Sequence, residues 1–88
     1  MTESRRVLVL HLATGGEPLV FALSPRAGKS LLPRLAVLMG SGGVESTDLE
    51  DGTSVAINFG HVVSAHFDSF PGNARVYGVP QRQSGFGG

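Results

Sequence analysis

The apolar residues of this chain gather in short runs that glycine-containing turns separate, a pattern more typical of β-strands than of long helices. Residues 7–13, VLVLHLA, are apolar on both alternating faces, as in a strand that is covered on two sides. The turn-forming sequence TGGE follows at residues 14–17, and a second apolar run, LVFAL, occupies residues 19–23. The two runs predict a β-hairpin.

A helix is predicted after this hairpin, because Ser24 can cap the free N–H groups of a first turn and Pro25 then sits where no N–H group is required. Pro33 lies inside the helical pattern, where proline removes a hydrogen bond and clashes with the preceding turn. The helix therefore either kinks at Pro33 or starts late, at Ser30, and it ends near Met39. Apolar residues recur along it at helical spacing: Ala27, Leu31, Leu35 and Leu38.

The second half of the chain predicts another hairpin and a final strand. Residues 44–50 and 53–59 flank an Asp-Gly pair, the strongest short hairpin signal in the sequence. Alternation within the second of these runs directs Ile57 and Phe59 to the core. Residues 62–67 form the last predicted strand. Together the elements predict an α+β fold, a small ββαβββ sheet with one helix packed on it.

The composition of the chain changes at residue 69. From there to the C-terminus the sequence loses periodicity and is rich in Gly, Pro, Ser, Gln and Asn, a composition that does not repay the entropy cost of ordering. We therefore assign a compact α+β domain to residues 1–68 and a flexible arm to residues 69–88. Three residues of the arm are candidates for docking on a partner: Tyr77, Val79 and Phe86.

Composition narrows the classes of function. A chain of 88 residues is long enough for one domain. Seven Lys and Arg balance seven Asp and Glu, so no net positive field favours nucleic acid or an anionic membrane. The lack of cysteine excludes disulfides and thiolate zinc sites and is compatible with a cytoplasmic setting. Because no run approaches the roughly 18 apolar residues that cross a bilayer, we expect no membrane span.

Two sequence motifs suggest a phosphate-binding loop and a metal site, but each lacks residues that such a site needs. The Gly-Lys-Ser triplet around Lys29 resembles the end of a phosphate-binding loop, but Leu23 stands where that loop needs glycine and Pro25 removes an N–H group. Histidines invite a metal site, yet His61 and His66 are predicted on opposite faces of one strand, with His66 on the side of Val62, Ser64 and Asp68. We therefore expect no enzymatic activity, no catalytic residue, no cofactor and no bound metal.

The sequence VLVLHLATGGEPLVFALSP, followed by a helix, resembles the opening of the β-grasp fold of ubiquitin-like proteins and sulfur carriers. The resemblance is one of arrangement, and it covers residues 5–43 together with the C-terminal pair Gly87 and Gly88. Proteins of that family end in Gly-Gly, whose carboxylate is activated by adenylation, so the resemblance implies a carrier that acts through Gly88. A shorter stretch, FGHVVSAH at residues 59–66, is similar to a segment of RemA-type DNA-binding regulators.

The function favoured by these observations is a non-enzymatic module that binds another protein or assembles with its own copy. Arg26, Lys29 and Arg34 form a predicted positive face on the helix. The carrier is one alternative, and a small nucleic-acid-associated regulator that also uses Arg5 and Arg6 is the other. The acidic residues of the second hairpin are predicted to form a solvated turn, with contact to a basic partner as the alternative: Glu45, Asp48, Glu50 and Asp51.

Overall fold

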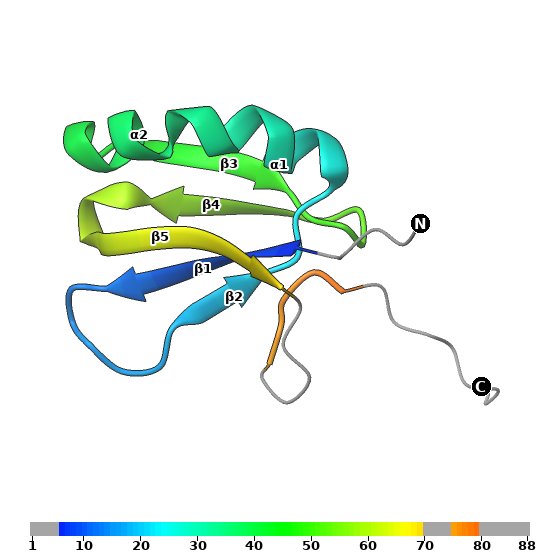
Figure 1. The fold of residues 1–88 in the computed structure, drawn as a ribbon, viewed down its shortest axis with the longest axis horizontal. Helices are drawn as coiled ribbons and strands as arrows, with labels where there is room; N and C mark the ends of the chain where they lie inside the picture. The colour runs from blue at the N-terminus through cyan, green and yellow to red at the C-terminus, as the bar shows by residue number, and fades with distance from the viewer. Residues whose placement is uncertain (1–5, 70–74, 80–88) are drawn as a thin grey trace, which may run out of the picture.

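The computed structural model describes residues 6–69 and 75–79. In that part of the chain five strands pack against one side of an interrupted helix, and the predicted α+β class and ββαβββ order are confirmed (Figure 1). The elements follow in the order β1 (Arg6–Leu12), β2 (Leu19–Phe21), α1 (Pro25–Leu31), the 3-10 turn η1 (Leu32–Arg34), α2 (Leu35–Ser41), β3 (Val44–Asp48), β4 (Ser54–Asn58), the 3-10 turn η2 (Phe59–His61) and β5 (Val62–Ser69).

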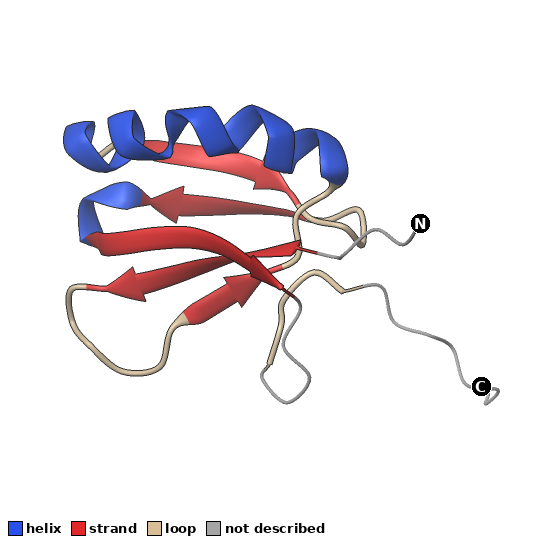
Figure 2. Ribbon diagram, in the orientation of Figure 1, coloured by secondary structure: helices blue, strands red, loops and turns tan. Residues whose placement is uncertain are grey.

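The strands form two antiparallel groups on one side of the helix (Figure 2). Strand β1 lies between β2 and β5 in a three-stranded sheet, while β3 and β4 form a separate hairpin. A single bridge between Leu23 and Leu49 joins the groups where β2 and β3 end. The N–H of Ser24 donates to the carbonyl of Asp48 at 3.0 Å, and the N–H of Glu50 donates to the carbonyl of Ala22 at 2.8 Å.

The helix begins where its sequence signal predicts. Pro25 is its first residue, and the hydroxyl of Ser24 accepts a hydrogen bond from the N–H of Ala27 at 3.2 Å. The alternative start at Ser30 is therefore wrong, and Pro33 is accommodated by one tighter 3-10 turn between α1 and α2. The helix continues beyond the predicted Met39 to Ser41, where Gly42 caps it in the left-handed conformation at φ +71°.

The main core lies between the helix, the three-stranded sheet and the β3–β4 hairpin. The predicted inward face is confirmed, because Ile57 of β4 and Phe59, the first residue of η2, are both buried in the main core. The opposite face of the three-stranded sheet has a second, smaller cluster of Val7, Val9, Val20 and Ala22. The buried members of the main core are Leu8, Leu10, Phe21, Leu23, Leu31, Leu35, Leu49, Ile57, Phe59 and Val62.

The pairing of β1 with β5 contains a register shift, and because of it one residue of β5 lies on the opposite face from the one predicted. His66 pairs with Val9 and Asp68 with Val7, so both belong to the side of the small cluster, as predicted. Val62 was predicted on that side too, but the register shifts near the end of β1 and Val62 pairs with Leu12. It is consequently buried in the main core, because an inserted residue reverses the alternation of faces.

Two neighbouring leucines test the position of this core. Leu31 is 1% exposed, whereas Leu32, the next residue, is 52% exposed. Leu31→Ala is expected to lower the free energy of unfolding by about 2–5 kcal/mol, because it leaves a cavity among well-packed side chains. Leu32→Ala, the matched control, should change it by less than about 0.5 kcal/mol. Urea unfolding of both variants measures the difference, and equal losses would contradict the assigned core face.

Candidate functional site

Strand β3 is paired with β4, and two hydrogen bonds establish which of its residues face that partner. The N–H of Leu49 donates to the carbonyl of Thr53 at 2.7 Å, and the N–H of Phe59 donates to the carbonyl of Gly43 at 2.9 Å. Successive residues of an antiparallel strand direct both backbone polar groups alternately toward and away from the partner. The odd-numbered residues of β3 therefore face β4, and the even-numbered residues face away from it.

The residues that face away are Val44, Ser46 and Asp48. The carbonyl of Asp48 accepts the hydrogen bond from Ser24, so this end of the edge is occupied. The backbone groups of Val44 and Ser46 have no hydrogen-bond partner within residues 6–69 and 75–79, and the side chain of Val44 is 66% exposed. Beyond the bridge to β2, β3 is thus an open sheet edge.

An open groove of about 210 Å³ runs between α1 and this edge. Its walls contain positively and negatively charged side chains together with hydroxyl groups. Asp48, at one end of the groove, accepts the hydrogen bond from Ser24, the residue that caps the first turn of α1. The residues that line the groove are Arg26, Ala27, Ser30, Leu31, Arg34, Glu45, Ser46, Thr47 and Asp48.

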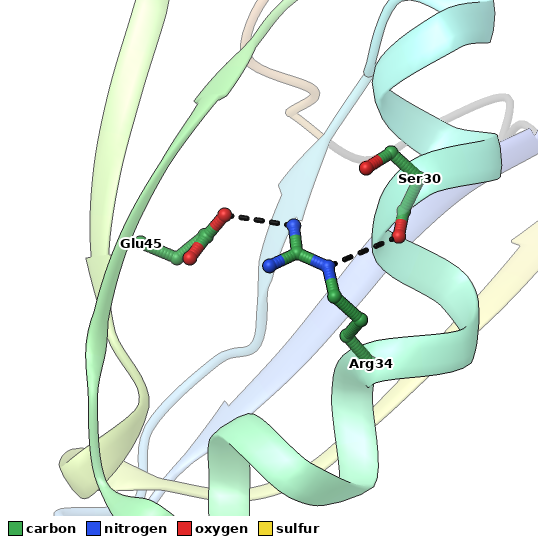
Figure 3. Close-up of polar contacts among 3 residues, drawn as sticks. All are labelled: Ser30, Arg34 and Glu45. Atoms are coloured by element: carbon green, nitrogen blue, oxygen red, sulfur yellow. Dashed lines mark hydrogen bonds and ion pairs between the residues drawn. The ribbon is translucent and has the colours of Figure 1, made fainter.

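Arg34 crosses the groove from the helix to the strand (Figure 3). Its Nη2 lies 2.8 Å from Oε2 of Glu45, and its Nε donates to the carbonyl of Ser30 at 3.2 Å. An exposed pair of this kind contributes at most about 1 kcal/mol to stability, but two contacts fix the direction of the guanidinium group. Arg34 therefore forms part of the wall of the groove.

The three cations predicted to form one positive face have different environments. Arg26 lines the groove, and no carboxylate lies within ion-pair distance of it in the described part of the chain. Lys29 is exposed on α1 outside the groove lining. Arg34 is neutralised by Glu45, a member of the predicted acidic turn. Arg26 is thus the cation in the groove that can meet a carboxylate from another molecule.

Tyr77 and Val79, two of the predicted contact residues of the C-terminal arm, do not line this groove. Tyr77 hydrogen-bonds to strand β2, and Val79 packs on the small cluster of the three-stranded sheet. Phe86, Gly87 and Gly88 lie outside the described residues, and so does Arg5. The predicted flexibility of residues 69–88 and the predicted role of Gly88 remain predictions.

The histidines form one contact that the sequence did not predict. The rings of His11 and His66 stack across β1 and β5 with centroids 5.7 Å apart, and Nε2 of His66 lies 3.7 Å from Oδ2 of Asp68. His61 lies in η2. Within the described ranges, no three His, Cys, Asp or Glu side chains are grouped so that they could hold a metal ion. Nor do those residues include a helix that is long and apolar enough to span a bilayer.

Sequence patterns did not reveal Ser46 as part of a candidate site, and they identified Glu45 and Asp48 only as members of an acidic turn. Their chemistry is ordinary for a surface strand, and their importance comes from which edge of β3 remains unpaired. Comparisons with protein-family models, with curated proteins and with solved structures found no match for this chain. Its function has to be argued from the groove and the open edge.

The turn between β3 and β4 yields a test of the local electrostatics. The hydroxyl of Thr53 donates to Oδ1 of Asp51 at 2.6 Å and the N–H of Thr53 donates to the same atom at 2.9 Å, and these bonds lower the pKa of Asp51. Thr53→Val removes the hydroxyl, so the pKa of Asp51 should rise toward its ordinary value. An NMR titration of the Asp51 carboxyl carbon measures the shift.

The same interaction determines how the turn responds to acid. Because the pKa of Asp51 is lower in the folded than in the unfolded chain, its contribution to stability is present above the unfolded pKa, about 3.9, and is lost as the pH falls through the folded value. Wild type and Thr53→Val should therefore converge in stability at acid pH. Ser54→Ala is the control and should leave the pKa of Asp51 unchanged. An equal pKa of Asp51 in wild type and Thr53→Val would contradict the assigned hydrogen bond.

Proposed function

We propose that this protein is a non-enzymatic interaction module that binds an extended segment of another protein, or of its own copy, along the open edge of β3. The observation that carries the proposal is the pair of outward-facing residues Val44 and Ser46 on this edge. Ser46 lines the groove beside α1. An added strand would hydrogen-bond to these groups, and the groove would receive its alternate side chains. Affinity then comes mainly from main-chain bonds.

The chemistry of the edge supports this proposal. Natural proteins commonly protect free edges with proline or with lysine, and β3 contains neither in its sequence VESTD. Exposed Val44 provides apolar contact beside the unpaired backbone groups. Arg26 is available to a carboxylate of the bound segment, since Arg34 is already paired with Glu45. The preferred ligand is therefore an extended segment that carries an acidic residue.

The alternatives receive less support. The carrier hypothesis depends on Gly87 and Gly88, and the nucleic-acid hypothesis depends partly on Arg5, all of which lie outside the described residues. Among the helix cations, Arg34 is neutralised within the chain. We therefore favour strand addition, and we include a cytoplasmic location in the same proposal.

A proline substitution tests the role of the edge. Ser46→Pro removes the outward N–H of Ser46 without breaking a hydrogen bond to β4, and proline is tolerated on edge strands. We expect it to weaken partner binding or self-association at least about tenfold, which corresponds to 1.4 kcal/mol and is reasonable for a lost bond combined with a steric block. Native mass spectrometry and quantitative affinity capture from the native host measure the two forms of association.

Ser46→Ala is the matched control, because it keeps the backbone N–H and changes only the side chain. It should associate like wild type, and thermal unfolding should show that the proline variant is still folded. Strand addition at β3 would be refuted if folded Ser46→Pro forms the same complexes, with the same affinities, as Ser46→Ala.

A further inference from the structure

The outer edge of β2 already holds a short segment from the C-terminal part of the same chain, which forms a β-bridge with it (Figure 1). Tyr77 pairs with Phe21 in parallel orientation. The N–H of Tyr77 donates to the carbonyl of Val20 at 2.8 Å, and the N–H of Ala22 donates to the carbonyl of Tyr77, also at 2.8 Å. Both backbone groups of Tyr77 are therefore used in binding the sheet edge.

Side chains of this segment contact both faces of the sheet. Val76 and Val79 pack on the small cluster formed by Val7, Val9, Val20 and Ala22. The ring of Tyr77 lies beside that of Phe21, with centroids 5.6 Å apart and planes inclined by 34°. Because Phe21 belongs to the main core, the segment covers the edge between the two hydrophobic clusters.

Gly78 makes this fit selective. Its φ is +90°, a conformation that residues with a side chain rarely adopt. A Cβ atom at this position would lie 2.7 Å from Cβ of Leu49 and 3.0 Å from the carbonyl oxygen of Ala22. Leu49 is buried and Ala22 is backbone-bonded to Glu50, so neither can move away easily. Glycine is required between the tyrosine and the second valine.

We propose that the outer edge of β2 is a binding site for an extended Val-Tyr-Gly-Val segment, and that residues 76–79 of the same chain occupy it as a ligand that a peptide of the same sequence can replace. Five residues, 70–74, connect β5 to residue 75. A connection this short gives the chain's own segment an effective concentration of about millimolar, so a free peptide binds best when that segment is displaced.

This binding site on the β2 edge is independent of the function proposed for β3. It uses the β2 edge and the residues Val76–Val79, whereas the open β3 edge uses Val44 and Ser46. Ser46→Pro should leave peptide binding at β2 unchanged, and Tyr77→Pro, which introduces no clash with Leu49, should leave the unpaired groups of β3 in place. Failure of one proposal is therefore distinguishable from failure of the other.

The experiment uses a fluorescent peptide of residues 75–79, RVYGV, and the full-length chain. Gly78→Ala in the protein should displace its own segment and leave the β2 edge free. We expect the peptide to bind this variant at least about tenfold more tightly than wild type, because the wild-type segment competes at its effective concentration. Fluorescence anisotropy measures both affinities. A peptide in which the glycine is replaced by alanine is the matched control and should not bind.

A second variant guards against loss of the fold. Tyr77→Pro removes the N–H that donates to Val20, and it should leave the β2 edge free without introducing a contact with Leu49. The proposal is overturned if the peptide binds neither folded variant, or if it binds wild type equally well. It is also overturned if both variants unfold, because the segment is then an integral strand.

Discussion

The bridge between Leu23 and Leu49 is the contact on which the arrangement of the molecule depends. At this bridge, backbone hydrogen bonds connect the end of the three-stranded sheet to the β3–β4 hairpin. Both leucines are buried in the main core. Ser24 follows directly. Its N–H bonds to Asp48, its carbonyl accepts the N–H of Gly28, and its hydroxyl caps the first turn of α1. One residue thus joins the strands and starts the helix.

This junction explains why the β2 and β3 edges differ. After Ser24 the chain leaves the sheet to form the helix, so the part of β3 that precedes Asp48 has no strand neighbour on this side within the described residues. The helix instead runs beside the strand, and the space between them is the groove that Arg34 crosses. On the other side, β2 ends at the same junction, and Tyr77 completes its outer edge. Leu49 contributes to both features, since it closes the bridge and limits residue 78 to glycine.

Signals that act within a few residues predicted the elements well. The Ser24–Pro25 pair identified the start of the helix, and the Asp-Gly pair at residues 51 and 52 identified the second hairpin, because capping and turn geometry depend on adjacent residues. The course of the chain at Pro33 was left open, since packing against the core decides whether one 3-10 turn is tolerated.

Features that depend on pairing between distant strands were not predictable in the same way. The register shift that buries Val62 and the stacking of His11 on His66 require knowledge of how β1 aligns with β5. The candidate site has the same origin. Arg26 and Arg34 were identified by charge, but the open backbone groups of Ser46 follow only from the pairing of β3. The role of Gly78 likewise depends on contact with Leu49, far away in the sequence.

Amide hydrogen exchange, followed residue by residue by NMR, tests the central claim that the junction at Leu23 and Leu49 closes one edge and leaves the other open. The account predicts strong protection of the amides of Ala22, Ser24 and Glu50, all of which donate across or beside the junction. It predicts exchange close to the unprotected rate for Val44 and Ser46. Protection of Ser46 equal to that of Ser24 in the monomer would contradict it.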